Sequence, residues 1–262
     1  MLAIERKALI KEAVLEKKSV VVSELSQQFD VTEETIRRDL KALEAEGFLT
    51  RTYGGAFIQE GSINDVDVSV RETAYVESKK QIALQCLSLV NNGDAIFLDG
   101  STTALETARA LQGMHLTVLT NSLLIADLLA KSQDIRLIII GGTLYPQSMC
   151  FFGNATLEEL TTYYVDTAFI SCRSLSLQNG VTDSTEQNAA LRKKIVTRAD
   201  RTYLLADHTK FNRTSFIKIC DFQELRGIIT DQALSPEWHQ MAAESHLELL
   251  EFTSQPAKKV RK

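Results

Sequence analysis

Residues 19–57 read SVVVSELSQQFDVTEETIRRDLKALEAEGFLTRTYGGAF, and this stretch decides how the N-terminal part of the chain folds. Two short helical patterns lie on either side of a break at Asp30–Val31, and two extended runs with a Gly-Gly pair between them follow. Ser23 and Thr32 stand where N-caps of the two helices belong. This order predicts a winged helix-turn-helix, a domain that places one helix in the major groove of DNA.

The second helix of this pair separates its apolar residues from its basic ones. Ile36, Leu40 and Leu43 recur at spacings of four and three and form one buried stripe, and Gly47 ends the helix. The basic side chains fall outside the stripe and are expected to face DNA. We expect Arg37 and Arg38 to contact bases and phosphates. A second group is expected to position the DNA backbone, and it comprises Thr32, Thr35, Lys41, Arg51 and Gly54.

The net charge of residues 1–58 does not by itself favour DNA binding. The segment has nine Lys or Arg against ten Asp or Glu, a net charge of −1, whereas nucleic-acid-binding domains are more often basic. Any short helical pair can also carry two arginines on a solvated face. The basic residues are nevertheless concentrated in the second helix and the wing, where phosphates would lie.

The run VTEETIRRDL at 31–40, followed by Leu43, Gly47 and RTYGGA at 51–56, resembles the signature of the DeoR family of bacterial repressors of sugar metabolism. The resemblance implies sequence-specific binding to double-stranded operator DNA and control of a carbohydrate-utilisation operon. Tyr53 departs from the family pattern, which usually has His at this place. We expect this difference to have a small effect on wing packing or phosphate contact.

The composition is that of an ordinary globular protein. The 262 residues are 44% hydrophobic and 24% charged, with a net charge of −5. The longest apolar runs are too short to span a bilayer, and the first residues lack the apolar core of a signal peptide. We therefore expect a cytoplasmic protein with no membrane association. The four Cys and four His are scattered, which predicts buried free thiols, no metal site and no cofactor.

Changes in sequence pattern along the chain suggest the domain boundaries. A helical pattern over 2–17 opens the DNA-binding domain, and Val20–Val22 is expected to pair with the wing as a strand. The segment QEGSINDVDVSV at 59–70 loses helical periodicity and is read as linker. The expected organisation is a DNA-binding domain at 1–58, a linker at 59–73, an effector domain at 74–254 and a basic, disordered tail at 255–262.

The effector domain alternates apolar strand patterns with helical ones. Expected strands cover 94–99, 116–120, 135–140, 167–172, 202–206, 227–230 and 247–252. Helical patterns lie between most of them, at 103–111, 122–131, 186–199 and 236–245. This order predicts an α/β fold with a mainly parallel, Rossmann-like sheet covered on both faces. Ligands of such sheets bind at the carboxyl ends of the strands.

Four loops that follow expected strands are rich in Gly, Ser, Thr and charged residues. Any one of them alone is explained as a helix-capping turn, but four at one edge of one sheet predict a pocket for a small phosphorylated ligand. Lys210 would supply a point charge for a phosphate or a carboxylate. The residues expected to bind this effector are Asp99, Gly100, Ser101, Thr102, Thr103, Asn121, Ser122, Gly141, Gly142, Asp207 and Lys210.

The region from Tyr75 to about Phe252 is similar to the effector domain of DeoR-type repressors, which shares its fold with ribose-phosphate isomerase and glucosamine-phosphate deaminase. The resemblance rests on the Asp-Gly-Ser-Thr-Thr loop at 99–103 and the Asp-x-x-Lys-Phe run at 207–211. It implies two further effector-binding residues, Lys79 and Asp166. Sugar isomerisation needs a positioned base and a partner acid, and the sequence shows no such pair.

The leading hypothesis is therefore a sugar-phosphate-controlled repressor without catalytic residues, acting as a homo-oligomer, either a dimer or a tetramer. Paired recognition helices would supply the contacts that one short helix lacks. One alternative is an active sugar-phosphate isomerase or deaminase that carries a DNA-binding appendage. Another is an adaptor that assembles on DNA without a small ligand.

Overall fold

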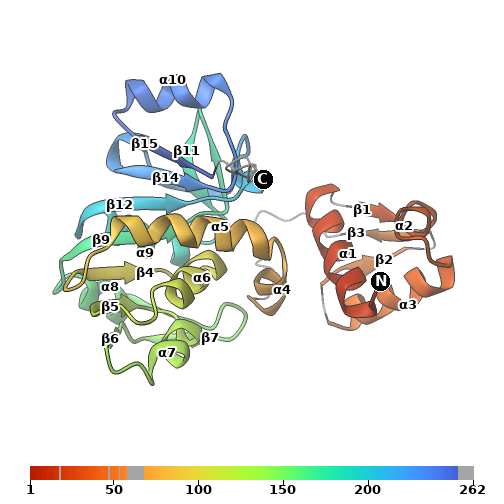
Figure 1. Ribbon diagram of the computed structural model, residues 1–262, viewed down its shortest axis with the longest axis horizontal. Coiled ribbons are helices and arrows are strands. Elements are labelled where there is room, and N and C mark those ends of the chain that lie inside the picture. Colours follow the sequence, from red (N-terminus) through yellow and green to blue (C-terminus); the bar gives the residue numbers. More distant parts are fainter. Residues whose placement is uncertain (18, 47, 53, 58–67, 253–262) are drawn as a thin grey trace, which may run out of the picture. The chain divides into compact units, whose positions relative to one another are not determined.

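The computed structural model describes the chain except for residues 18, 47, 53, 58–67 and 253–262. The expected helix end at Gly47, Tyr53, most of the linker and the basic tail lie outside the described residues. The chain divides into two compact units, Met1–Val76 and Glu77–Lys262. Figure 1 shows both units, and each is described here by itself.

The first unit is a winged helix-turn-helix. Its elements are α1 (Ala3–Lys17), β1 (Ser19–Val21), α2 (Val22–Phe29), α3 (Glu33–Ala45), β2 (Thr50–Arg51), β3 (Gly55–Phe57) and α4 (Val68–Thr73). Strand β3 lies between β1 and β2 and pairs antiparallel with both, so the strand expected before α2 does join the wing. The core of the unit comes from α1, α2, α3 and the wing.

The caps of α2 and α3 differ in how well the sequence predicts them. Thr32 caps α3, because its Oγ1 accepts the N–H of Thr35 at 3.3 Å. The prediction for Ser23 was wrong: α2 starts at Val22, and its N-cap residue is Val21, which makes no side-chain cap. Val22 is buried and donates its N–H to the Gly54 carbonyl at 2.9 Å, so a bond to the wing satisfies the helix start instead.

Residues 68–73 form helix α4, although the sequence suggested that they continue the linker. Val68 is buried. Tyr75, just after the helix, donates its N–H to Glu12 Oε1 at 3.1 Å and its hydroxyl to the Glu12 carbonyl at 3.2 Å. These contacts with α1 bind the segment to the first unit, and the weak helical period of residues 59–70 gave no sign of them.

One buried ion pair joins the first helix of this unit to the recognition helix. Arg6 Nε donates to Asp39 Oδ2 at 2.6 Å, and both side chains are 5% exposed. Asp39 shares the inward side of α3 with Ile36, Leu40 and Leu43. The pair therefore fixes which side of α3 faces α1, and the opposite side is left facing outward.

The second unit is an α/β domain. Its elements in chain order, with η for short 3₁₀ helices, are α5 (Val76–Cys86), η1 (Leu87–Leu89), β4 (Ala95–Leu98), α6 (Thr102–Ala110), β5 (Leu116–Thr120), α7 (Leu123–Leu129), β6 (Ile135–Ile139), β7 (Thr143–Tyr145), β8 (Cys150–Phe152), α8 (Asn154–Leu160), β9 (Val165–Ser171), β10 (Ser174–Ser176), β11 (Gly180–Asp183), α9 (Glu186–Val196), β12 (Ala199–Leu205), η2 (His208–Lys210), β13 (Ile217–Cys220), η3 (Phe222–Glu224), β14 (Gly227–Thr230), α10 (Pro236–Glu244) and β15 (Glu248–Glu251).

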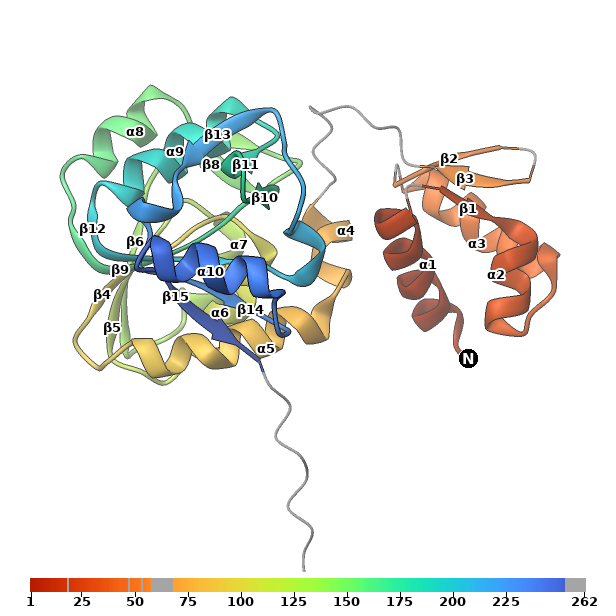
Figure 2. The ribbon, with the colours of Figure 1, turned by 90° about the horizontal axis from the view of Figure 1, so that it is seen from above.

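Seven parallel strands form the central sheet in the order β15-β14-β12-β9-β4-β5-β6. They correspond to the strands expected from the sequence. Apolar side chains of α5, α6 and α7 pack on one face, and those of α8, α9 and α10 pack on the other. Figure 2 shows α5 and α9 on opposite sides of the sheet. Alternating burial explains this, since Phe97 joins one core while Ile96 and Leu98 join the other.

The chain reverses its direction across the sheet between β4 and β9. Strands β5 and β6 lie on one side of β4, and β9, β12, β14 and β15 follow in turn on the other side. Such a reversal leaves a crevice at the carboxyl ends of the two central strands, where ligands of open α/β sheets bind.

Two small antiparallel sheets were not expected from the sequence. One is the β7–β8 hairpin, and the other has the order β10-β11-β13. Their strands are three or four residues long, too short to show an alternating pattern of their own. Across the described ranges, no helix is both long and apolar enough to cross a lipid bilayer.

Candidate functional site

The outward side of α3 carries two exposed cations that are not neutralised by the rest of the chain. Arg38 and Lys41 are exposed, and neither side chain forms an ion pair or a hydrogen bond with any residue that the structure describes. Arg37 is in a different state, since its Nη2 donates to Glu33 Oε2 at 2.6 Å. Both arginines expected to contact DNA are thus exposed on α3, but Arg37 is held in an intramolecular ion pair and Arg38 is not.

The remaining residues expected to contact DNA lie at the start of α3 and in the wing. Thr32 and Thr35 hydroxyls lie 3.0 Å apart at the first turn of the helix. Arg51 on β2 binds Glu44 through Nε at 2.6 Å, and this hydrogen bond lowers the pKa of the Glu44 carboxyl. Gly54, in the turn of the wing, is exposed. No DNA is present, so the individual contacts stay predictions.

Intramolecular ion pairs hold several of the acidic side chains that contribute to the net charge of this domain. Asp39 is held by Arg6, Glu44 by Arg51, and Glu46 by Lys7 and Lys11 at 3.6 and 2.9 Å. These carboxylates are paired with cations other than Arg38 and Lys41. The charge that matters for DNA is therefore local, and the sum over the domain hides it.

In the second unit, the loop between β4 and α6 leads into the N-terminus of a helix, the geometry expected for an anion site. Ser101 caps α6, because its Oγ accepts the Ala104 N–H at 3.0 Å. Thr102 and Thr103 occupy the first two positions of the helix, where the backbone N–H groups have no partner within the helix. They lie at the positive end of the helix dipole, which favours a phosphate or a carboxylate.

Asp99 holds this loop in place and is fully engaged in doing so. Its Oδ1 accepts the Ser101 N–H at 3.0 Å, and its Oδ2 accepts the Ser171 N–H at 2.8 Å and Arg192 Nε at 2.7 Å. Arg192 also donates to Asp183. Asp99 was expected to bind the effector directly. Its position instead makes it the anchor that shapes the loop.

Burial makes this arrangement energetically demanding. Asp99, Asp183 and Arg192 are 1%, 2% and 6% exposed. Burial disfavours the charged form of Arg192, but the two carboxylates outweigh it and raise the pKa of the guanidinium. Sequence reasoning missed Arg192 and Asp183. The signal was a charged residue at helical spacing with Ala189 and Ile195 on the apolar side of α9, which indicates a buried partner.

Gly100 and Asn121 pack against the β7–β8 hairpin. A Cβ on Gly100 would lie 2.0 Å from Cys150 Sγ, so only glycine fits there. Asn121 Nδ2 donates to the Phe151 carbonyl at 3.0 Å, while its buried Oδ1 has no donor among the residues that the structure describes. Ser122 caps α7 through Oγ and the Ile125 N–H.

Strand β12 brings the second charged loop to the same edge. Asp207 Oδ1 accepts the Thr209 N–H at 2.9 Å, which orders the turn that carries Lys210. Within the described part of the chain, the Lys210 ammonium forms no ion pair. Burial raises the pKa of the Cys172 thiol to about 12, and the positive charges of Lys210 and Arg192 act against this shift. Lys210 and Arg192 are therefore both near the end of β9.

Lys79 lies on α5 and is buried, with the residue as a whole 4% exposed. Its neighbour Ser78 hydrogen-bonds to Asp231, which follows β14. Burial disfavours ionisation of Asp231, but hydrogen bonds from His208 and Ser78 prevail and lower the pKa of the carboxyl. These contacts place the start of α5 at the carboxyl edge of the sheet, in agreement with the position expected for Lys79.

One expected effector residue lies at the other edge of the sheet, and two more, which follow β6, are engaged with α8 and the β7–β8 hairpin. Asp166 lies near the start of β9, at the opposite edge of the sheet, where its Oδ2 accepts the Ala95 N–H at 2.7 Å. Gly141 is bound to α8, since its N–H donates to Glu159 and its carbonyl accepts from Thr156. Gly142, at a φ of +142°, packs on the Phe152 carbonyl. Asp166 stands at the start of its strand, whereas the loops of the carboxyl edge follow their strands. A Cβ on Gly142 would lie 2.7 Å from the Phe152 carbonyl, while one on Gly141 would meet no atom within 4 Å.

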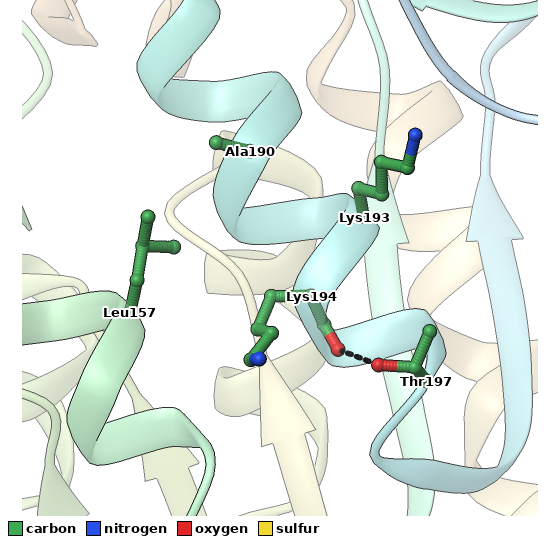
Figure 3. Close-up of a pocket in the computed structure, with 5 residues that line it drawn as sticks. All are labelled: Leu157, Ala190, Lys193, Lys194 and Thr197. Carbon is green, nitrogen blue, oxygen red and sulfur yellow. Dashed lines mark hydrogen bonds between the residues drawn. The ribbon is translucent and has the colours of Figure 1, made fainter. Parts of the chain in front are cut away.

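A separate surface depression of about 370 Å³ lies between α8 and α9 and contains none of the expected site residues. It is lined by Leu157, Ala190, Lys193, Lys194 and Thr197. Figure 3 shows Leu157 directed from α8 toward α9, and the ammonium groups of Lys193 and Lys194 on different sides of α9. No metal-binding group of His, Cys, Asp or Glu occurs among the described residues.

Comparison with known proteins identifies the two units. Residues 6–61 match the DeoR-like helix-turn-helix domain, and residues 74–232 match the DeoR C terminal sensor domain. The chain belongs to the DeoR family. DeoR-family membership confirms the predictions of a winged helix-turn-helix, of a transcriptional regulator that binds DNA, and of a protein that is not an enzyme.

Relatives of similar length extend the match to most of the chain. An uncharacterized HTH-type transcriptional regulator, YulB of Bacillus subtilis (strain 168), is 42% identical over 236 residues, which are 90% of this chain and 92% of YulB. The putative aga operon transcriptional repressor of Escherichia coli O157:H7 is 32% identical over 234 residues, covering 88% and 87% of the two chains.

Among solved structures, ribose 5-phosphate isomerase A from Methanocaldococcus jannaschii covers 53% of this chain and 55% of its own. The sequence identity is 18% and the TM-score is 0.40.

Removing the guanidinium of Arg192 is expected to disrupt the effector domain. Arg192→Met leaves Asp99 and Asp183 buried without a counter-charge, which should lower the free energy of unfolding of this domain by about 3–5 kcal/mol. Denaturant unfolding followed by the fluorescence of Trp238 measures the change. Lys193→Met, an exposed neighbour on α9, is the control and should stay within about 0.5 kcal/mol of wild type. Equal stability of the two variants would contradict the anchoring role.

Proposed function

We propose that this DeoR-family regulator represses a carbohydrate-utilisation operon, and that a phosphorylated sugar bound at the carboxyl edge of the C-terminal sheet controls its affinity for operator DNA. The protein would act in the cytoplasm as a homo-oligomer, a dimer or a tetramer. The single observation that carries the effector proposal is that the start of α6 and the Lys210 ammonium lie at the same edge of the sheet.

The spacing of the two sites fits a small sugar phosphate. Strand β9 is the only strand between β4 and β12, and neighbouring strands lie about 4.8 Å apart, so the two strand ends are separated by about 10 Å. Arg173 follows β9 between them, and its side chain forms no ion pair in the described ranges. A phosphate at the start of α6 would leave the sugar hydroxyls within reach of the β12 turn.

The carboxylates of this edge support binding rather than catalysis. Asp99 and Asp183 are both held by Arg192, and Asp231 is held by His208 and Ser78, so three of the carboxylates at this edge are engaged within the chain. The alternative of an active sugar-phosphate isomerase or deaminase is tested by incubating the purified protein with ribose 5-phosphate and glucosamine 6-phosphate. Turnover of either compound would contradict the sensor role.

Control of transcription requires that the ligand bind two arrangements of the protein with different affinity. Repression is the proposed sign of control: the relative from Escherichia coli O157:H7 is named a repressor of an operon, although other relatives are named L-fucose operon activators. An adaptor that assembles on DNA without a small ligand would show no response to any phosphorylated sugar.

The DNA-binding proposal predicts that α3 is indispensable. The double variant Arg37→Ala/Arg38→Ala should weaken operator binding by at least about 1–3 kcal/mol, the contribution of one specific base contact. Electrophoretic mobility shift with the promoter region of the protein's own operon measures the loss. Lys131→Ala, an exposed cation of the effector domain, is the control. Wild-type affinity of the double variant would show that α3 is not the reading helix.

The effector proposal predicts stabilisation by a phosphorylated sugar. At a ligand concentration of about 100 Kd, the binding term should add about 2.7 kcal/mol to the free energy of unfolding. A thermal-shift screen of sugar phosphates, with the unphosphorylated sugars as controls, identifies the ligand. Lys210→Met and Thr102→Ala should reduce the shift, and Lys131→Met should preserve it. A shift that is the same in all of these variants would place the ligand elsewhere.

A further inference from the structure

The two adjacent arginines of the recognition helix differ in their surroundings. Arg37 Nη2 donates to Glu33 Oε2 at 2.6 Å, one turn earlier in α3, and the two side chains are 47% and 45% exposed. Arg38 is exposed and has no such partner in the described part of the chain. Glu34, beside Glu33 in the first turn, is likewise exposed and unpaired there.

The helix geometry gives these residues different directions. Successive residues of an α-helix are rotated by about 100°, so Glu33, Arg37 and Glu44 lie on one flank of α3. Glu44 holds Arg51, so this flank faces the wing. Arg38 and Lys41 are turned farther from the stripe of Ile36, Leu40 and Leu43. One flank thus carries Arg37, tethered to Glu33, and the outermost face carries Arg38, Lys41 and Glu34, which have no ion-pair partner among the described residues.

The Glu33–Arg37 pair has an electrostatic cost in a DNA-binding surface. Exposed ion pairs contribute little to stability, because water screens them. A carboxylate at the end of α3 that enters the groove also repels phosphates. Its benefit lies in the arginine: a guanidinium reads guanine through a fixed pair of donors, and a carboxylate that holds one edge of the guanidinium restricts its orientation before binding.

We propose that Glu33 is a specificity-determining positioning residue. Its carboxylate orients Arg37 toward a base edge and hinders the transfer of Arg37 to a phosphate, while Arg38 binds the phosphate backbone. On non-specific DNA, Arg37 has to leave Glu33 to reach a phosphate, and Glu33 is then left unpaired beside the duplex. On the operator, Arg37 reaches its base with the pair intact. The inference rests on DNA binding through α3.

The test compares one selected duplex with a scrambled one. The full-length wild-type protein selects its preferred duplex from a random library, and fluorescence anisotropy then measures binding to that duplex and to a scrambled duplex of the same composition. Glu33→Gln should strengthen binding to the scrambled duplex and lower the ratio of the two affinities by about tenfold, the discrimination of one base contact. Glu34→Gln removes the same charge from the same turn and should leave the ratio unchanged.

A double-mutant cycle separates positioning from simple charge removal. In an Arg37→Ala background, Glu33→Gln should no longer change the ratio. Arg38→Ala should weaken binding to both duplexes alike and reduce the slope of the salt dependence by about one. Thermal unfolding of each variant should match wild type, since all four side chains are exposed.

Two results would overturn the role of Glu33. One is an equal gain in affinity for both duplexes in Glu33→Gln and Glu34→Gln, which would reduce Glu33 to an unspecific charge. The other is an unchanged effect of Glu33→Gln when Arg37 is absent. A wild-type protein that binds both duplexes equally would instead contradict sequence-specific DNA binding itself, and this outcome is recognised before any variant is made.

Discussion

The sensor domain depends on one buried guanidinium. Arg192 of α9 bridges Asp99, at the end of β4, and Asp183, at the end of β11. Asp99 uses its remaining capacity to bind the backbone of Ser101 and Ser171, so the loop before α6 and the end of β9 are fixed by the same carboxylate. The two strands that flank the reversal of the sheet are therefore held in register at the edge where a ligand would bind.

This arrangement explains how the loop before α6 can be fixed in place and still be available to bind a ligand. Buried charges are stable only when they are paired and hydrogen-bonded, and the Arg192 cluster meets this condition entirely with side chains and backbone of the sheet. Thr102, Thr103 and Lys210 are then not needed for the framework. A phosphate can be bound by helix N–H groups and a lysine without any change in the anchor that shapes the site.

Paired charges also organise the DNA-binding domain. A domain with a net charge of −1 can bind DNA because its carboxylates are matched to particular cations. Arg6 and Asp39 orient α3 from the inside, and Glu44 and Arg51 connect α3 to the wing. On the outer side of α3, Arg38 and Lys41 stay without an ion pair in the part of the chain that the structure describes. Charge distribution, and not the sum, decides how this surface meets a polyanion.

The sequence predicted the parts that depend on local pattern and missed those that depend on distant partners. Apolar alternation located the strands of the parallel sheet, and Thr32 was recognisable as a cap because capping is a three-residue interaction. Ser23 failed as a cap because a bond from Val22 to Gly54 fixes the start of α2. Arg192 was missed because it joins two partners on different strands: Asp183 is nine residues away, but Asp99 is 93 residues away.

Family resemblance supplied what local pattern could not, and it also produced an error. Its assignment of Lys79 to the effector site stays a prediction, with the neighbouring Ser78 bonded to Asp231 after β14, whereas Asp166 lies at the amino edge. Asp166 stands at the start of β9, and the ligand-binding loops of a parallel sheet follow the ends of its strands. A match over a few residues did not distinguish these two positions.

The central claim is that a sugar phosphate in the C-terminal domain changes the affinity of the N-terminal domain for DNA. The most direct measurement is the Kd for operator DNA, determined by anisotropy with and without a saturating sugar phosphate. The account predicts a change of at least about fivefold, and by thermodynamic linkage an equal change in the Kd for the sugar phosphate when operator is bound. A ligand that binds tightly but leaves the operator Kd unchanged would contradict it.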